Sequence, residues 1–173
     1  YMDQDLMKKY IVDYGKDLYS FCVYLTGSRD KADDLYQQTF LTAIEKGNLD
    51  DTQNPKAYLI TIAVNLWKNQ KKKYAVRNKK ANIIYLEADN PEQLADGSES
   101  VEEQLIREEE KRLVRKLVDS LPDKLRIVIL MFYMEDMSLL EISKVLHIPL
   151  GTVKSRIHQA KSRLKERMSK YEG

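Results

Sequence analysis

The sequence contains little of what most enzymes and extracellular domains depend on. Its 173 residues include one cysteine, Cys22, and two histidines, His147 and His158. A single cysteine excludes an intramolecular disulfide and a thiolate metal cluster. The histidines have no carboxylate at ligand spacing, so we expect no metal site. No Ser/His/Asp or Cys/His set and no glycine-rich phosphate loop can be assembled, and we therefore expect neither an enzyme nor a protein with a cofactor or a small-molecule substrate.

Long apolar runs are also missing. No stretch approaches the ~18 consecutive apolar residues that suggest a membrane span, and no signal peptide is recognisable. We therefore expect a soluble cytoplasmic protein without direct membrane insertion. Apolar residues still make up 43% of the chain, enough for packed cores. Cys22 lies in an apolar helical pattern with Leu18, Phe21 and Leu25, which favours a buried, structural thiol.

The charges are segregated along the chain, although the formal net charge is only +2. Residues 66–80 contain seven Lys or Arg and no acid, residues 86–110 contain ten acids and one Arg, and residues 150–170 contain seven bases and one acid. Two basic blocks separated by an acidic one favour two contacts with a polyanion. Three solvated helix faces would account for the charges alone equally well.

Helical periodicity dominates the sequence, so the predicted fold class is all-α. The first helix is expected to end at Gly27, and the second to run from a cap at Ser28 to Gly47. The third begins near Pro55, a residue suited to the first turn, and continues into a lysine-rich tail. Its expected inner face contains Leu59, Ile62, Ala63 and Leu66. These three helices can close one small core, whereas residues from about 75 to 97 lack periodic apolar positions and are predicted to form a linker.

The C-terminal part is predicted to contain about four helices. The first runs from near Val101 to Ser120, and the second has Leu125, Val128, Ile129 and Phe132 on its apolar face. Ser138 to Glu141 fits a capping box ahead of a short helix, residues 139–146, which the turn "HIP" joins to a long final helix. This layout is typical of a helix-turn-helix.

The final helix has two distinct faces. Its inward stripe is expected to be Val153, Ile157, Ala160, Leu164 and Met168. The polar side chains expected to face outward are Lys154, Ser155, His158 and Gln159. Thr152 and Arg156 are expected at the edge of that face. All six can bond phosphates or base edges, and the helix start favours a phosphate. We therefore expect this helix to enter a major groove; the plainer alternative is a bundle helix with an incidental basic face.

The whole chain resembles the extracytoplasmic-function (ECF, group four) sigma factors of bacterial RNA polymerase. "ADDLYQQTFLTAIE" is similar to the family's Ala-Glu-Asp-Leu-x-Gln-x-x-Phe signature, and "PKAYLITIAVNLWKNQKKK" looks like its promoter-melting segment. "LPDKLRIVILMFYMEDMSLLEISKVLHIPLGTVKSRIHQAKSRLKE" looks like its second domain. The resemblance covers residues from about 5 to 164. It implies a sigma-2-like domain over residues 1–80, a linker over 81–104 and a sigma-4-like domain over 105–173.

The resemblance also implies which residues make the contacts. The outer face of the second helix is expected to dock on the clamp coiled coil of core polymerase: Asp33, Asp34, Gln37, Gln38 and Leu41. Gln38 stands where many members have Glu. The residues expected to hold a flipped base of the minus-ten element or to follow melted DNA are Leu49, Ile62, Asn65, Lys68, Asn69 and Lys72. Trp67 beside them is expected to pack in the core. Recognition of the minus-thirty-five element falls to the final helix.

The function implied is that of an alternative sigma factor, which binds core RNA polymerase, directs it to specific promoters and helps open the DNA. The implied partners are the clamp and flap regions of the polymerase, promoter DNA, and an anti-sigma factor that is linked to the membrane. Two other classes remain open from the residues alone. One is a stand-alone helix-turn-helix regulator with an N-terminal dimerisation domain, and the other is a structural or adaptor bundle.

Overall fold

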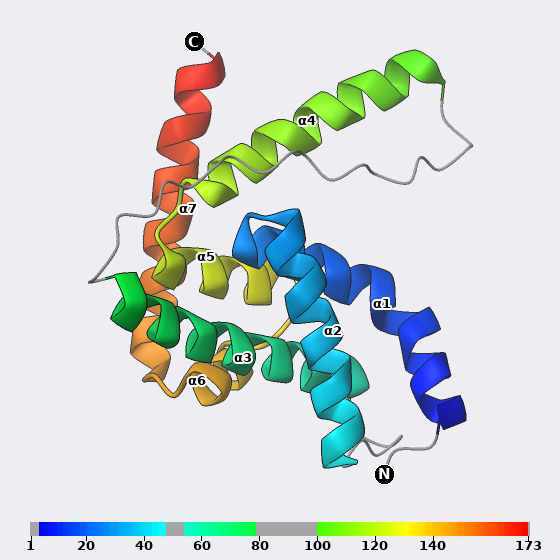
Figure 1. Cartoon of the computed structure of the whole chain (residues 1–173). Helices are drawn as coiled ribbons and strands as arrows, with labels where there is room; N and C mark the ends of the chain where they lie inside the picture. Colours follow the sequence, from blue (N-terminus) through cyan, green and yellow to red (C-terminus); the bar gives the residue numbers. More distant parts are fainter. Residues whose placement is uncertain (1–3, 48–53, 79–99, 173) are drawn as a thin grey trace. The chain divides into compact units, whose positions relative to one another are not determined.

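A computed structural model describes residues 4–47, 54–78 and 100–172 of the chain. The regular structure of these ranges is helical throughout, which confirms the predicted all-α class. The helices are α1 (Gln4–Thr26), α2 (Arg29–Lys46), α3 (Pro55–Asn78), α4 (Val101–Asp119), α5 (Asp123–Ile129), the π-helical turn η1 (Leu130–Met134), α6 (Leu139–Leu146) and α7 (Leu150–Glu172) (Figure 1). None of these helices is long and apolar enough to cross a membrane. The chain divides into two compact units, Tyr1–Asp89 and Asn90–Gly173.

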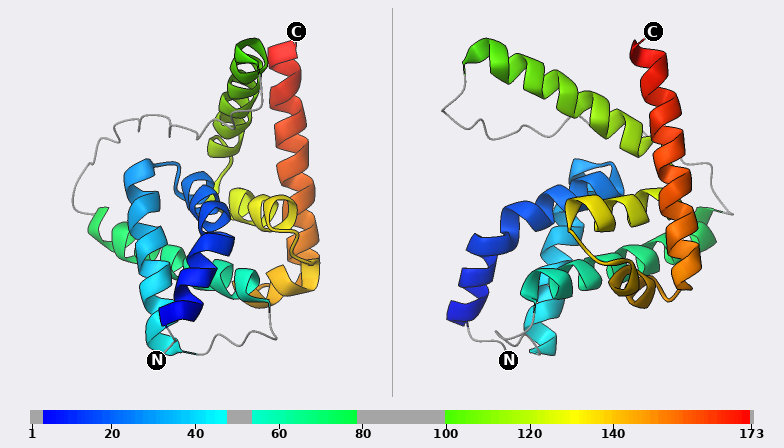
Figure 2. Two further views of the ribbon diagram at one scale, coloured as in Figure 1. Left: turned by 90° about the vertical axis from the view of Figure 1, so that its right-hand side faces the viewer. Right: turned by 180° about the vertical axis from the view of Figure 1, so that it is seen from behind.

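The N-terminal unit is a three-helix core in which α1, α2 and α3 each pack on the other two (Figures 1 and 2). Its interior is built from apolar side chains of all three helices: Leu18, Phe21, Cys22, Leu25, Leu35, Phe40, Leu59, Ile60, Ala63 and Val64. Cys22 is fully buried, as the sequence predicted. At the edge of this core, Lys56 of α3 forms an ion pair with Asp17 of α1 at 2.5 Å.

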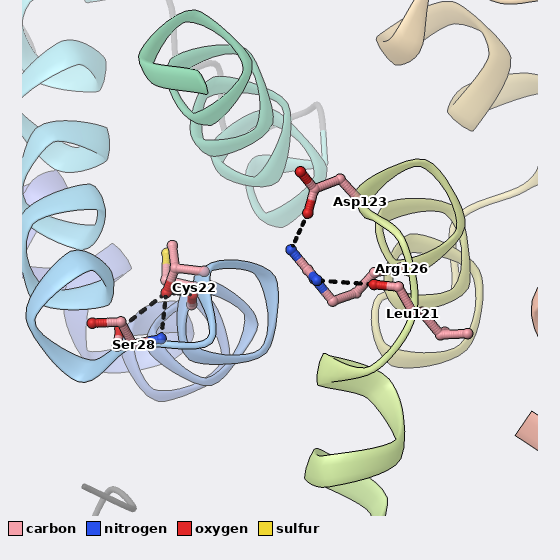
Figure 3. A network of polar contacts seen from close by, with 6 residues as sticks. Cys22, Ser28, Leu121, Asp123 and Arg126 are labelled. Atoms are coloured by element: carbon pink, nitrogen blue, oxygen red, sulfur yellow. Dashed lines mark hydrogen bonds and ion pairs between the residues drawn. The ribbon is translucent and has the colours of Figure 1, made fainter. Parts of the chain in front are cut away.

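Local capping residues set the ends of these helices where the sequence predicted them. Gly27 and Gly47 both adopt the left-handed conformation, with φ of 70° and 59°, which glycine enters without a steric cost. The Ser28 side chain accepts a hydrogen bond from the Lys31 amide at the start of α2. The Thr26 hydroxyl lies 2.8 Å from the Cys22 carbonyl oxygen, to which it donates, and also accepts from the Ser28 amide (Figure 3). These contacts close the turn between α1 and α2.

In the C-terminal unit, α7 packs on α5 and α6 and also contacts α4. The figures show α4 meeting α7 near its own C-terminal end and diverging from it toward its N-terminal end (Figures 1 and 2). Accordingly Leu117 and Val118 are buried, whereas Leu105 and Ile106 are exposed. Because α4 begins at Val101, residues 101–104, which the resemblance assigns to the linker, belong to this helix.

A buried arginine ties α5 to the segment that precedes it. Arg126 is only 8% exposed. Its guanidinium donates to the Leu121 carbonyl oxygen at 3.2 Å and forms an ion pair with Asp123 at 2.6 Å (Figure 3). A buried cation is tolerated only when it is paired and hydrogen-bonded, and these two contacts supply both conditions.

Two expectations for the C-terminal unit need correction. The predicted second helix gives way at Leu130 to the π-helical turn, so Phe132 is half-buried whereas Leu125, Val128 and Ile129 are buried. Met168 was expected to face inward but is 44% exposed. The inward stripe of α7 is buried at Val153, Ile157 and Ala160, half-buried at Leu164 and open at Met168.

Candidate nucleic-acid interface

The junction between α6 and α7 is fixed by its own hydrogen bonds. The Ser138 hydroxyl accepts from the Glu141 amide at 3.0 Å and caps α6. At the other end His147 adopts the left-handed conformation, with φ 56° and ψ 46°, which ends the helix. The Ser143 carbonyl oxygen accepts from the His147 and Ile148 amides, and the Ser143 hydroxyl donates to the Ile148 carbonyl oxygen at 2.6 Å. His147 is therefore the turn residue that the sequence predicted.

Apolar side chains hold the two helices at a defined angle. Ile142 and Leu146 of α6 are buried, as are Val153 and Ile157 in the first two turns of α7. Tight packing of such side chains makes the angle between two helices costly to change. The α6–α7 pair consequently presents the start of α7 as a rigid element, which is the geometry of a helix-turn-helix.

The polar face at the start of α7 points to solvent. Four of its predicted side chains are exposed: Lys154, Ser155, His158 and Gln159. The other two, Thr152 and Arg156, are half-buried at its edge. The Gln159 side chain lies within 3.4 Å of the Ser155 hydroxyl, to which its amide nitrogen donates. Gly151 stands in open space, because a Cβ atom added to it would meet nothing within 4 Å. The face thus combines positive charge, amide and hydroxyl donors, and room at the helix start.

A second polar stripe runs along α3. Asn65, Asn69 and Lys72 are exposed and Lys68 is half-buried, and their spacing of three, four and seven residues places them on one side of the helix. Trp67 is 7% exposed and lies in the core, as predicted. The Lys71 ammonium lies 5.4 Å from the centroid of its ring.

Two other residues, Ile62 and Leu49, were also predicted to contact DNA. Ile62 is only 5% exposed. Its side chain therefore contributes to the core, as its place on the inner face of the helix predicted, and its contact with DNA stays a prediction. Leu49 lies outside the described residues.

The outer face of α2 is polar apart from one leucine. Its five predicted residues are all exposed: Asp33, Asp34, Gln37, Gln38 and Leu41. Leu41, at 52% exposure, is an apolar side chain among hydrogen-bonding neighbours, a composition that suits a protein interface of moderate hydrophobicity. The opposite side of α2 supplies the buried residues Ala32, Leu35, Thr39, Phe40 and Ala43.

Sequence reasoning missed two polar contacts that shape these faces. One is the Ser143 hydroxyl in the α6–α7 turn. The other is Tyr19 of α1, whose hydroxyl donates to Asp33 at 2.7 Å. The pKa of Tyr19 is raised, chiefly by burial and then by its hydrogen bond to Asp33. Tyr19 and Asp33 are 14 residues apart, so no local spacing signals their contact.

Comparison with known families agrees with this division into two units. The family "Sigma-70 region 2" matches residues 10–77, and "Sigma-70, region 4" matches residues 111–164. The first match covers most of α1, all of α2 and all but the last residue of α3. The second covers the last part of α4 and the helix-turn-helix.

Individual relatives extend the similarity over nearly the whole chain. The ECF RNA polymerase sigma factor SigW of Bacillus subtilis is 30% identical over 175 residues, which cover 96% of this chain and 90% of the relative. The ECF RNA polymerase sigma-E factor of Escherichia coli K12 is 29% identical, with coverage of 92% and 84%.

Solved structures show the same fold. The sigma factor RpoE of Bartonella quintana, crystallised with the anti-sigma factor NepR, superimposes with a TM-score of 0.75 at 23% identity, covering 96% of this chain and 98% of RpoE. CnrH, in complex with the cytosolic domain of CnrY, gives a TM-score of 0.62 at 19% identity, with coverage of 96% and 90%. With two sigma-70 regions in order and a 30% identical relative matched along nearly its full length, the chain belongs to the ECF RNA polymerase sigma factors.

Proposed function

We propose that this chain is an alternative sigma factor that binds core RNA polymerase, directs it to a small set of promoters and helps open them. The observation that carries the proposal is the similarity to ECF sigma factors across both units of one chain. A stand-alone regulator would need only the helix-turn-helix. Catalysis of RNA synthesis belongs to the polymerase.

The C-terminal unit is proposed to recognise the minus-thirty-five element with the start of α7. The exposed side chains Lys154 and Gln159 lie within two turns of the helix start, the part of such a helix that reaches base edges. The half-buried Arg156 at the edge of the face is proposed to contact a phosphate. Gly151 leaves the first turn uncovered, so that a phosphate can approach the amino end of the helix.

The N-terminal unit is proposed to hold the polymerase with α2 and the minus-ten element with α3. The acidic and amide side chains of α2 suit a clamp surface that supplies donors and positive charge. On α3, Asn65 is proposed to bind the edge of a flipped base through its amide, while Lys68 and Lys72 follow the DNA backbone. Unstacking a base costs a few kcal/mol, and a helix that already exposes the amide offsets part of that cost.

An anti-sigma factor is a further proposed partner. RpoE was crystallised with the anti-sigma factor NepR, and CnrH with the cytosolic domain of CnrY. We extend this mode of control to the present chain: a protein that covers the polymerase-binding and DNA-binding faces keeps it inactive. If that protein is linked to the membrane, the sigma factor is held there until it is released.

The test is transcription in vitro with purified core polymerase and a library of genomic fragments. Addition of the protein should start transcripts that core polymerase alone does not make, and their upstream sequences should share two conserved elements. Failure to start any new transcript would contradict the proposal. Binding of the protein alone, as a dimer, to defined DNA sites without an effect on core polymerase would instead support a stand-alone regulator.

A further inference from the structure

Asp33, at one edge of the outer face of α2, is held by a residue of another helix. The Tyr19 hydroxyl of α1 donates to the Asp33 Oδ1 atom at 2.7 Å. Tyr19 is half-buried, whereas Asp33 is exposed. The carboxylate therefore projects from the surface, but one of its oxygen atoms is hydrogen-bonded to the half-buried tyrosine of α1.

The Tyr19 ring is itself supported by a row of aromatic side chains. It meets Tyr36 edge to face, with ring centroids 5.6 Å apart and an interplanar angle of 85°. Tyr36 in turn meets Phe40, which is 6% exposed, at 5.1 Å and 75°. Such edge-to-face pairs have a preferred geometry and so restrict the rotation of each ring. The row runs from the core of the unit to the hydroxyl that holds Asp33.

Close approach of α1 to α2 is part of the same arrangement. A Cβ atom on Gly15 of α1 would lie 3.0 Å from the Tyr36 hydroxyl, close enough that the tyrosine would have to give way slightly. Glycine at this position therefore lets Tyr36 occupy the space between the two helices, next to Tyr19.

The chemistry of the contact leaves Asp33 available to a partner. Burial and the neighbouring Asp33 raise the pKa of Tyr19, although Arg29 acts in the opposite direction, so the phenol stays protonated and remains a donor at neutral pH. An ionised carboxylate has about four acceptor positions on two oxygen atoms. The tyrosine takes one of them on Oδ1, so the carboxylate keeps acceptor positions that a cationic or amide donor can use.

We propose that Tyr19 is a positioning residue of the polymerase-binding face, which fixes the Asp33 carboxylate in the orientation that core polymerase binds. This inference rests on the proposed function of the α2 face. A free aspartate must lose rotamer freedom when it binds, and a carboxylate that is already oriented avoids that loss. Loss of the hydroxyl should therefore weaken binding moderately, by about three- to tenfold.

The experiment is a double-mutant cycle with the full chain and purified core polymerase. The four proteins are the wild type, Tyr19→Phe, Asp33→Ala and the double variant, and the Kd is measured for each by fluorescence anisotropy. Tyr24→Phe is the matched control, because it removes a hydroxyl from another half-buried tyrosine of α1. Circular dichroism checks that all variants keep their helicity.

We expect Asp33→Ala to weaken binding about tenfold or more, Tyr19→Phe to weaken it about three- to tenfold, and the double variant to bind no more weakly than Asp33→Ala. Tyr24→Phe should bind like the wild type. A purely structural role of Tyr19 would instead lower affinity equally in the presence and absence of Asp33, and such additivity would overturn the inference.

The other outcomes separate this inference from the function on which it rests. If Asp33→Ala weakens binding but Tyr19→Phe does not, the positioning role is wrong and the α2 face stands. If Asp33→Ala has no effect while the protein still directs transcription, Asp33 is not a polymerase contact and the inference fails, although the sigma function stands. If the wild type does not bind core polymerase at all, both fail.

Discussion

The Ser143 hydroxyl donates to the Ile148 carbonyl oxygen across the α6–α7 turn, at 2.6 Å. The same residue accepts two amide hydrogen bonds through its backbone carbonyl oxygen, from His147 and Ile148. Ser143 is thus bonded to both residues that change the chain direction. These hydrogen bonds help to fix the angle at which α7 leaves α6, and hence the face it offers to DNA.

Ser143→Ala should therefore destabilise the C-terminal unit by about 0.5–1 kcal/mol. The Ile148 carbonyl oxygen loses its partner, which costs about 1 kcal/mol, and the better helix propensity of alanine offsets part of that loss. Native-state hydrogen exchange of the α6 and α7 amides measures the change. Ser162→Ala, at an exposed position of α7, is the matched control. Equal protection in both variants would mean that the hydroxyl contributes nothing to the turn.

Gly151→Ala should move stability and DNA binding in opposite directions. The new Cβ meets nothing within 4 Å, and alanine restricts the unfolded chain, so the free energy of unfolding should rise by about 0.4–1 kcal/mol. The added methyl group occupies space at the amino end of α7, where we propose that a phosphate approaches. Thermal unfolding and binding of the polymerase complex to promoter DNA are the two measurements. A variant that is more stable and binds as tightly as the wild type would contradict the phosphate approach.

Lys154 and Gln159 should differ from Arg156 in what their loss does to promoter choice. A base-edge contact is worth roughly 1–3 kcal/mol of discrimination, so Gln159→Ala or Lys154→Ala should relax preference at particular upstream positions. A phosphate contact carries no sequence information, so Arg156→Ala should weaken all sites alike and lower the salt slope by about one. Selection from a randomised upstream element, with each variant bound to polymerase, gives the comparison. Unchanged preference in every variant would mean that α7 does not choose the sequence.

Asn65→Ala should impair promoter opening more than promoter binding. The amide is proposed to bind a base that becomes accessible only after the duplex is distorted. Permanganate footprinting should show less melted DNA, while occupancy by the polymerase stays near that of the wild type. Gln70→Ala, at another exposed position of α3, controls for loss of a surface amide. Equal losses of melting and occupancy would assign Asn65 a role in the helix itself.

Replacement of Asp34 and Gln37 by alanine should weaken binding to core polymerase without a loss of fold. Both side chains are exposed, and surface changes of this kind usually alter stability by no more than ~0.5 kcal/mol. Affinity should fall about tenfold or more if both side chains form charged or amide contacts in the interface. Asp13→Ala removes an exposed carboxylate from α1 and should bind normally. Wild-type affinity of the double variant, with unchanged helicity, would exclude this face as the docking surface.

The helix boundaries followed from the sequence because the signals that set them are local. Ser28 and Ser138 cap helices, and Gly27 and Gly47 end them, at the predicted positions. A cap requires one side chain and one amide three residues later, so a few neighbouring letters determine it. The same holds for the exposed face of α7, which the period of the apolar residues defines.

What the sequence did not predict depends on contacts between distant residues. The π-helical turn after α5 changes the period at Leu130, and the burial of Met131 and Met137 beside it is a property of the assembled unit. Met168 continues the apolar stripe of α7 by spacing alone and is nonetheless exposed. Periodicity gives the side of a helix on which a residue lies, but it does not say how far along the helix a neighbour extends.

In the candidate sites, too, the sequence predicted what local spacing determines and missed what depends on packing between helices. The outer residues of α2 are exposed as expected, and so is the polar stripe of α3 apart from the half-buried Lys68, because exposure follows from the helical period. Ile62 was expected both in the core and at the DNA; its burial confirms the first expectation, and the second stays a prediction. The bond from Tyr19 to Asp33 joins two helices, and only their packing brings the two residues together.

The reactivity of the buried Cys22 thiol can be used to measure how often the N-terminal unit opens. The side chain has no exposed surface and is the only cysteine in the chain, so an alkylating reagent can reach it only when the helices around it separate. Under conditions in which closing is faster than alkylation, the observed rate is the rate of a free thiol multiplied by the fraction of molecules that are open. Alkylation of the unmodified protein therefore measures the stability of this one unit, and its slowing on addition of a partner would show how strongly that partner holds the unit closed.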